Sequence, residues 1–260
     1  MPTFNKASFI QQTLLSIYQQ SYTQWRLLVI DDASTDRTPE LVKSLLTTPR
    51  AKLVQYKVNR GIGHILNQAL SMVNTKYFIQ VDGDDWIAPD TLERLIHRME
   101  KEPDSVALAY ANTIHWHQIG GVDYYHKLVR HRPFRDRYDF AAYDPMVQPR
   151  FYRTACVRQV GGWEVDDPTQ GRMMEDRRML LRLLDRFTFA YVDRPLYHFR
   201  YHHSNLSLDS NAHVYNRLRK LYTDRALIRW GDLYTADYVG PEHLWQSVRL
   251  VPKRKGGSAT

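Results

Sequence analysis

One short segment of the sequence carries three carboxylates within four residues. Asp82, Asp84 and Asp85 follow the mostly apolar run Tyr77–Val81, which is typical of a buried strand. Carboxylates this close repel one another unless a cation or several hydrogen-bond donors lie between them. An Asp-x-Asp pair at a strand end suits a hard divalent cation, because it leaves coordination positions for phosphate oxygens and water. The alternative is an acidic turn before the next helix, and the segment alone leaves both interpretations open.

A second acidic segment, Asp31–Asp36, follows the apolar run Leu27–Ile30. A carboxylate here can accept the imide N–H of uracil, or pair with a ribose or a metal ion. The alternative is a loop whose aspartate caps the following helix. We favour binding, because Asp31 and Asp32 precede any capping position. Since the carboxyl ends of parallel strands meet at one edge of a sheet, we expect this segment and Asp82–Asp84 to converge on one crevice.

Further carboxylates and histidines lie in the second half of the chain. Glu175 and Asp176 open a predicted helix, where one carboxylate could act as a general base on an attacking hydroxyl. The helix macrodipole also favours acidic residues in a first turn for stability alone. His198, His202 and His203 could supply a metal ligand, or could be surface or packing residues.

Two other residues have both a binding and a packing interpretation. Trp163 follows the turn Gly161–Gly162, and it is either a core residue or a flat platform for a sugar ring. Asn67 lies, with His64, on a predicted helix entered through Asn59–Gly61. Its alternative role is a hydrogen bond that packs this helix.

The composition sets limits on the class of protein. The 260 residues, 43% of them hydrophobic, predict one large domain, or one domain with a tail. The single cysteine excludes a disulfide framework and a multi-cysteine zinc site. No apolar run reaches the length of a membrane span and no leader pattern opens the sequence, so we expect a cytoplasmic protein, with association to the inner face of the membrane left open. The net charge of +8 suits phosphate-rich partners, anionic lipid or acidic glycans, or it simply keeps the protein soluble. No nucleic-acid motif accompanies this charge, and we expect no nucleic-acid partner.

Helical and strand patterns alternate over the first two-fifths of the chain. This alternation predicts an α/β fold with a mostly parallel sheet and helices on both faces. The region 107–150 is less regular, and we expect edge strands and a loop over the crevice there. The predicted helices are 9–18, 38–45, 62–73, 89–100, 152–160, 174–184 and 213–230, and the predicted strands are 27–30, 53–58, 77–81 and 187–192.

Seven motifs occur in an order that is more specific than any one of them. They are Met1–Lys6, Asp31–Asp36, Asn59–Gly61 with Asn67, Asp82–Asp85, Gly161–Trp163, Glu175–Asp176 and Arg200–His202. In this order they resemble the family 2 glycosyltransferases, inverting enzymes of the nucleotide-diphospho-sugar transferase superfamily with the Rossmann-like GT-A fold. The resemblance covers residues 1–207, about four-fifths of the chain. It implies a nucleotide-sugar-binding half over 1–105 and an acceptor-binding half over 106–207. Beyond it, the residue pattern predicts a C-terminal helix with a basic, partly disordered tail over 208–260.

The resemblance also implies roles for the residues that bind the donor. Thr3 and Asp32 would hold the base, Asp31 would support the loop, and Asp82 would contact the ribose or the sugar. The remaining nucleotide-sugar-binding residues would be Asn5, Arg60, Asn67 and Gly83.

The resemblance also assigns the metal ligands, the catalytic base and the acceptor site. Asp84 would bind Mn²⁺ or Mg²⁺ that bridges the diphosphate, and His202 matches a position that approaches the metal or the diphosphate in related enzymes. Asp176 would be the catalytic base, with Glu175 aiding acceptor contact. Trp163 would flank the acceptor site.

Two features depart from the family pattern. The family normally has an apolar strand before Pro-Thr-x-Asn, whereas only Met1 precedes Pro2 in this sequence. We expect a parallel sheet that lacks most of a central strand to leave backbone groups unpaired, at a cost in stability. Gly63 and His64 stand where many relatives carry small residues and an arginine, which alters how that helix meets the diphosphate.

The resulting hypothesis is a metal-dependent, inverting sugar transfer from a nucleoside-diphosphate donor to a hydroxyl acceptor, in bacterial polysaccharide or glycoconjugate synthesis. UDP is the expected nucleotide, with dTDP and GDP as alternatives; the acceptor is a glycan, a lipid-linked or a small molecule, and a homodimer is left open. The rival hypotheses are a metal-dependent nucleotidyltransferase and a non-catalytic nucleotide-sugar-binding module. The first would normally need a Gly-rich basic loop for a triphosphate, and Glu175–Asp176 argues against the second.

Overall fold

The computed structural model describes residues 1–206 and 208–253. Helices and strands alternate through the first hundred residues, as the sequence predicts. The helices are α1 (Ile10–Tyr18), α2 (Thr38–Leu45), α3 (Ile62–Met72), α4 (Thr91–Met99), α5 (Arg137–Ala141), α6 (Thr154–Gln159), α7 (Glu175–Leu183) and α8 (Ala212–Arg229), with a 3-10 turn at Asp209–Asn211. The strands are β1 (Pro2–Thr3), β2 (Leu27–Asp31), β3 (Ala51–Gln55), β4 (Tyr77–Gln80), β5 (Trp86–Ile87), β6 (Val106–Ile119), β7 (Val122–Val129), β8 (Gln148–Arg153), β9 (Thr188–Tyr201), β10 (Tyr234–Val239) and β11 (Ser247–Pro252).

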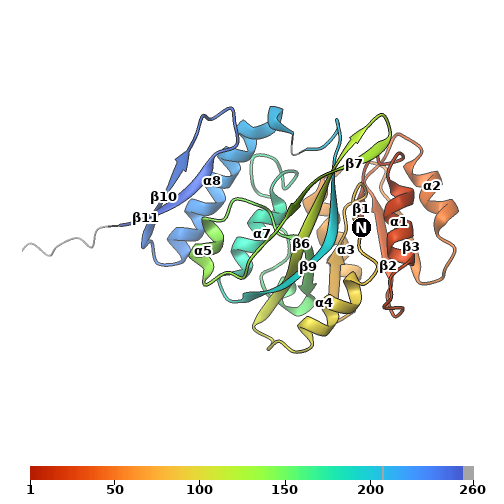
Figure 1. The fold of residues 1–260 in the computed structure, drawn as a ribbon, viewed down its shortest axis with the longest axis horizontal. Coiled ribbons are helices and arrows are strands. Elements are labelled where there is room, and N and C mark those ends of the chain that lie inside the picture. The colour runs from red at the N-terminus through yellow and green to blue at the C-terminus, as the bar shows by residue number, and fades with distance from the viewer. Residues whose placement is uncertain (207, 254–260) are drawn as a thin grey trace, which may run out of the picture.

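Two sheets form the centre of the molecule. The first is parallel, in the order β1-β2-β3. The second is mixed, in the order β4-β8-β6-β9-β5 with β7 paired to β6, and its one parallel pair among the described strands is β6 with β9. The α/β class is therefore confirmed, with the parallel character confined largely to the first sheet. Figure 1 shows this sheet with α1 and α2 at one end of the molecule and α8 with the β10–β11 hairpin at the other.

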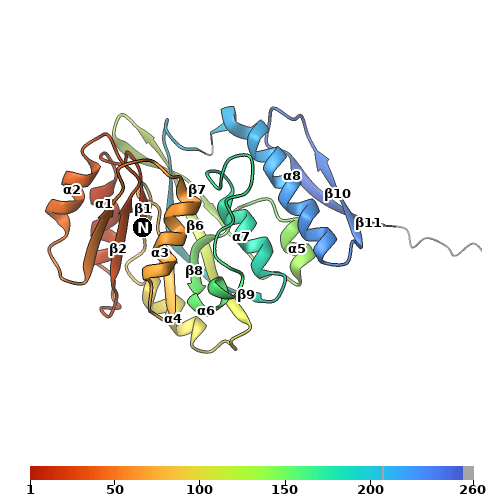
Figure 2. The same ribbon diagram turned by 180° about the vertical axis from the view of Figure 1, so that it is seen from behind.

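Hydrophobic side chains pack on both faces of the sheets. On one face, residues of α1, α2 and α4 form a cluster that includes Leu14, Val42 and Leu95. On the other face, α3, α6 and α7 pack with α8 around Leu66 and Leu180 (Figure 2). The helices thus cover both faces, as the sequence predicts, and the loops at the strand ends are left to form a site.

The middle of the chain differs from the expectation of irregular structure. β6 runs for 14 residues through the second sheet, and its first eight residues are buried. The helix predicted over 152–160 is wrong in its first two residues, because Tyr152 and Arg153 belong to β8, which pairs with both β4 and β6. Such pairing on two sides overrides a local helical pattern. The β10–β11 hairpin was not predicted at all, and the part of the tail expected to be disordered, 254–260, lies outside the described residues.

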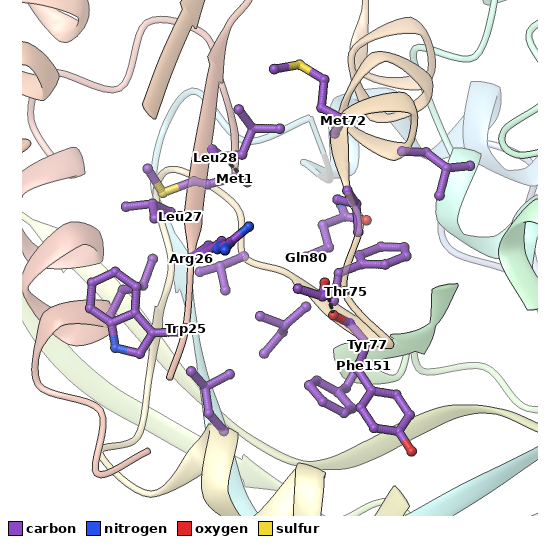
Figure 3. A pocket seen from close by; sticks show the side chains of 18 of the residues that line it. Met1, Trp25, Arg26, Leu27, Leu28, Met72, Thr75, Tyr77, Gln80 and Phe151 are labelled. Carbon is purple, nitrogen blue, oxygen red and sulfur yellow. Dashed lines mark hydrogen bonds between the residues drawn. The ribbon is translucent and has the colours of Figure 1, made fainter. Parts of the chain in front are cut away.

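The two sheets are separated by a groove of about 850 Å³. β1 is only two residues long, and it pairs with β2 on one side while β4 ends the second sheet on the other. Figure 3 shows Leu28 and Met1 on one side of the groove and Tyr77 on the other. The Met1 amino group donates to the Leu28 carbonyl at 2.8 Å, and burial lowers the pKa of this amino group to about 6.

Candidate active site

The acidic segment 82–85 forms a tight turn between β4 and β5. The Asp85 N–H donates to the Asp82 carbonyl at 3.1 Å, which closes the turn. Gly83 allows the end of β1 to approach, because a Cβ at this position would lie 2.8 Å from Oγ1 of Thr3 and 3.3 Å from Cγ of Lys6. The Thr3 carbonyl in turn accepts the Asp32 N–H at 2.9 Å. The two acidic segments therefore meet on either side of Thr3, as the sequence predicts.

Asp84 lies between a histidine and a lysine. Its Oδ2 atom is 3.0 Å from Nε2 of His202 and 2.5 Å from Nζ of Lys6. Nδ1 of His202 lies 2.9 Å from Oγ of Ser204, and this hydroxyl can donate to Nδ1 or accept from it, so the ring can present a protonated Nε2 to Asp84 or a free Nε2 to a cation. Burial alone would raise the pKa of the Asp84 carboxyl, but the His202 hydrogen bond and the Lys6 charge lower this pKa well below its ordinary value.

A buried arginine links the acidic turn to the start of α7. Arg150, on β8, places its Nη2 atom 3.0 Å from Oδ2 of Asp82 and its Nη1 atom 2.7 Å from Oδ2 of Asp176. Its side chain is 2% exposed, and its Nε atom has no hydrogen-bond partner among the described residues. Burial opposes the charged form of Arg150, but Asp82 and Asp176 together raise its pKa above the ordinary value. Asp82 and Asp176 are thus held in one site by a single guanidinium group.

The two carboxylates at the start of α7 have different environments. The residue before them, Met174, has a left-handed backbone with φ of 55°, a conformation that is strained for a side chain of this size. Oδ1 of Asp176 accepts the Arg177 N–H at 2.7 Å at the helix N-terminus. Glu175 is buried, and this burial, reinforced by the nearby charge of Asp176, raises its pKa well above the ordinary value. The pair therefore combines an ion-paired carboxylate with a carboxyl group that favours its neutral form.

Asp85, for which the sequence suggests no role, anchors the acidic turn to β9. Its carboxyl group accepts the Tyr197 hydroxyl at 2.8 Å and the Arg200 N–H at 2.9 Å. The Arg200 guanidinium donates to the Asp84 carbonyl at 2.6 Å and forms an ion pair with Asp123 of β7. These contacts fix the backbone from which Asp84 projects.

The segment 31–36 uses its side chains mainly to fix neighbouring loops. Asp32 accepts the backbone N–H groups of Arg60 and Gly61, each at 2.8 Å, while Asp31 accepts the hydroxyl of Ser34 at 2.5 Å. Both carboxylates are buried. The side chain of Arg60 is exposed and lies over the Tyr56 ring.

Asn5 joins the first loop to this segment. Its Oδ1 atom accepts the Thr35 N–H at 2.8 Å, and its backbone is left-handed with φ of 53°. Thr3 differs from its neighbours in the loop, because its hydroxyl oxygen is buried and has no hydrogen-bond partner among the described residues. A polar atom in this condition indicates a group that a ligand could satisfy.

Asn67 and Trp163 contact each other rather than the acidic turn. The Asn67 amide donates to the Trp163 carbonyl at 2.7 Å and accepts the Trp163 N–H at 2.8 Å. The Trp163 ring is buried and lies at 6.0 Å from the Tyr152 ring, edge to face. In this structure Trp163 presents no exposed face to a sugar, and the packing interpretation describes both residues.

The chemistry of the donor set allows a divalent cation at Asp84. A carboxylate oxygen and an imidazole nitrogen converge there, and the ammonium group of Lys6 already places a positive charge against the same oxygen. Among the residues that the structure describes, no group of three or more His, Cys, Asp or Glu side chains gathers as a metal site. A cation would thus have two protein ligands, Asp84 and His202, and would need further ligands from a diphosphate and water.

Sequence reasoning missed two residues that hold this site together. Arg150 had no local signal, because β8 carries a second arginine, Arg153, and the two carboxylates that Arg150 pairs with are distant in the sequence. Lys6 did have one, since it is the last residue of the motif Met1–Lys6.

With this geometry in place, comparison with known proteins identifies the family. The model of the glycosyl transferase family 2 matches residues 1–174, and the chain belongs to this family. The Bacillus subtilis protein EpsE is 36% identical over 103 residues, which are 39% of this chain and 37% of EpsE.

Two solved structures show the same GT-A fold. Staphylococcus aureus TarS 1-349 in complex with UDP-GlcNAc has a TM-score of 0.64 at 18% identity, over 85% of this chain and 64% of that one. The mannosyltransferase PcManGT from Pyrobaculum calidifontis, in complex with GDP-Man and Mn²⁺, has a TM-score of 0.62 at 20% identity, over 93% of this chain and 64% of that one. The chain thus spans less than two thirds of the length of each of these relatives. No described helix combines the length and apolar character needed to cross a membrane.

Proposed function

We propose that this chain transfers a sugar from a nucleoside-diphosphate donor to a hydroxyl acceptor, with inversion at the anomeric carbon. The observation that carries the proposal is the bridge through Arg150, which holds Asp82 of the acidic turn and Asp176 of α7 on one guanidinium group. A direct displacement needs the donor and the base in one site, on opposite sides of the reacting carbon.

Asp176 is the base in this proposal. It takes the proton of the acceptor hydroxyl as the hydroxyl oxygen attacks the anomeric carbon and the bond to the nucleoside diphosphate breaks. Arg150 and the Arg177 N–H orient its carboxylate from two sides. Glu175, whose pKa is raised by burial and by the charge of Asp176, favours its neutral form and can then donate a hydrogen bond to the acceptor or the sugar.

The donor binds along the acidic turn. Thr3, whose buried hydroxyl has no hydrogen-bond partner among the described residues, would find one in the donor, and Asp82 would face the ribose or the sugar. Asp31, Asp32 and Asn5 would shape the loops around the base, because their side chains accept backbone N–H groups of these loops. Asp84 and His202 would hold a divalent cation, which supplies positive charge to the departing diphosphate when it is bound.

We further propose a donor nucleotide, an acceptor class and a cellular location for the reaction. TarS was solved with UDP-GlcNAc and PcManGT with GDP-Man, and we favour a UDP-sugar for this chain. The net charge of +8 supports an anionic glycan or lipid-linked acceptor, at the cytoplasmic face of a membrane and in bacterial polysaccharide synthesis. The final helix and the hairpin that follows it would contribute to membrane apposition or to a homodimer.

Two measurements test the proposal in sequence. A thermal-shift panel of nucleotide sugars, with and without Mn²⁺, identifies the donor, because a ligand of the native state raises the unfolding midpoint. Product analysis with that donor should then find nucleoside diphosphate. Release of pyrophosphate from a nucleoside triphosphate instead would make the chain a nucleotidyltransferase.

A further inference from the structure

Lys6 is built into the site as a partner of Asp84. Its ammonium group is 2.5 Å from Oδ2 of Asp84, and its side chain is 18% exposed. The stem of Lys6 lies beside Gly83, where a Cβ would approach Cγ of Lys6 to 3.3 Å. The stem of Lys6 therefore packs against the acidic turn at Gly83, where a larger residue would crowd it.

The backbone of Lys6 is fixed, so only its side chain can move. Its N–H donates to Oγ1 of Thr38 at 2.7 Å. Its carbonyl accepts the N–H groups of Phe9 and Ile10, both at 2.9 Å, at the start of α1. If the Lys6 ammonium group left Asp84, the fixed backbone would keep it near this carboxylate, because it could move only as far as its own side chain allows.

The lysine and a divalent cation compete for the same oxygen atom. Oδ2 of Asp84 already accepts from His202 and contacts Lys6. A cation coordinated by Asp84 and His202 would lie against the Lys6 ammonium, and two positive charges at such a distance repel strongly in a buried site. Lys6 must leave Asp84 when the cation binds.

The Thr3 hydroxyl and the stem of Lys6 lie on the same side of Gly83, because a Cβ at this position would lie 2.8 Å from Oγ1 of Thr3 and 3.3 Å from Cγ of Lys6. The Thr3 hydroxyl is buried and has no hydrogen-bond partner among the described residues. A diphosphate bound beside them could accept from Thr3 and from a released ammonium group. The same lysine can thus neutralise Asp84 in the empty site and a diphosphate in the filled one.

We propose that Lys6 is an exchangeable counter-cation. In the free protein it forms an ion pair with Asp84. When a divalent cation binds Asp84, the Lys6 ammonium group leaves this carboxylate and forms an ion pair with the diphosphate of the donor. This inference rests on the proposed function and adds a coupling to it. Because coupling between two ligands is reciprocal, the cation and the nucleoside diphosphate each strengthen the binding of the other.

The experiment measures binding, not turnover. Isothermal titration calorimetry gives the affinity of the full chain for Mn²⁺ alone, for UDP alone, and for each in the presence of the other. Lys6→Met and Lys6→Gln remove the charge, and Lys6→Arg keeps it. The matched control is Lys76→Met, because Lys76 forms an exposed ion pair with Glu100 at 2.8 Å. Circular dichroism confirms that each variant is folded.

The expected result is about tenfold or more tighter Mn²⁺ binding by Lys6→Met and Lys6→Gln without nucleotide, since the competing charge is gone. The same variants should bind UDP alone more weakly, and their mutual enhancement should be smaller than in the wild type, because only the direct contact of the cation with the diphosphate remains. Lys6→Arg should resemble the wild type, and Lys76→Met should change nothing.

Equal Mn²⁺ affinity in the wild type and both neutral variants would overturn the role of Lys6 while leaving metal-dependent sugar transfer standing. Absence of Mn²⁺ binding in every variant, with and without UDP, would overturn both the inference and the metal dependence of the proposed function.

Discussion

Nε2 of His202 lies 3.0 Å from Oδ2 of Asp84, although 118 residues separate them in the sequence. β9 makes this contact, because it runs beside β5 with Trp86 opposite His198 and ends at Tyr201, next to the acidic turn. The ring of His202 is held from its other side by Phe9, at 4.3 Å between ring centroids. The two side chains thus form a pre-oriented pair rather than a chance surface contact.

Replacement of either member of this pair should weaken nucleotide binding only when metal is present. Asp84→Ala and His202→Ala should lower the Mn²⁺-dependent gain in UDP affinity by about tenfold or more, because each removes one of two protein ligands. Titration of UDP with and without Mn²⁺ measures this gain. An unchanged gain in Asp84→Ala would refute its role as a ligand.

Arg150→Met should destabilise the protein strongly. It removes the charge that two carboxylates share, and loss of one partner from a buried ion pair costs about 3–5 kcal/mol. Urea unfolding followed by circular dichroism measures the free energy. The control is Arg132→Met, whose ion pair with Asp139 leaves the Arg132 side chain 48% exposed and should contribute less than about 1 kcal/mol. If the two variants lost similar amounts of unfolding free energy, the larger contribution assigned to the buried Arg150 would be wrong.

Asn67→Ala should affect stability rather than donor binding. The substitution leaves the buried N–H and C=O groups of Trp163 without their partner, at a cost of about 1–3 kcal/mol. Unfolding and UDP titration on the same samples separate the two roles. If UDP affinity fell at least tenfold while the unfolding midpoint stayed constant, Asn67 would be a binding residue after all.

Glu175→Gln should change the pH dependence of stability. The native pKa of Glu175 is raised, so above the unfolded-state pKa the unfolded chain releases a proton that the native state still holds. The free energy of unfolding therefore falls as the pH rises from the unfolded pKa toward the raised native value. Glutamine cannot ionise, and the variant should gain stability over the wild type at pH 8 relative to pH 4.5.

Glu100→Gln provides the contrast for this measurement. The hydrogen bond from Lys76 lowers the pKa of Glu100, so this carboxylate stabilises the native state at higher pH and its replacement should bring no gain there. A pH-independent difference between wild type and Glu175→Gln would contradict the raised pKa.

The sequence predicted the acidic turn and its histidine but not the arginine between the carboxylates. Asp84 and His202 stand in motifs whose order identifies the family, and so their meeting could be predicted. The position of Arg150 depends on β8 lying antiparallel between β4 and β6, a pairing that no local pattern encodes. For Trp163, a core residue and a sugar platform look the same in sequence, and only the packing of Tyr152 against its ring distinguishes them.

The end of the chain shows the same limit of local patterns. The final helix was predicted from its spacing, and α8 confirms it within one residue at each end. The hairpin after it was not, because the alternation in β10 and β11 is weak: each strand buries one residue fully, Ala236 in β10 and Val248 in β11.

The central claim, that Asp176 is the base of a sugar transfer, is tested most directly by Asp176→Asn. With the donor identified by thermal shift, the rate of nucleoside diphosphate release should fall by about 10²–10⁴-fold, the range typical of a general base, while UDP affinity stays within about twofold. The control is Asp237→Asn, an exposed aspartate of β10 that should leave both values unchanged. A release rate in Asp176→Asn within about threefold of the wild type, in a folded protein, would contradict the account.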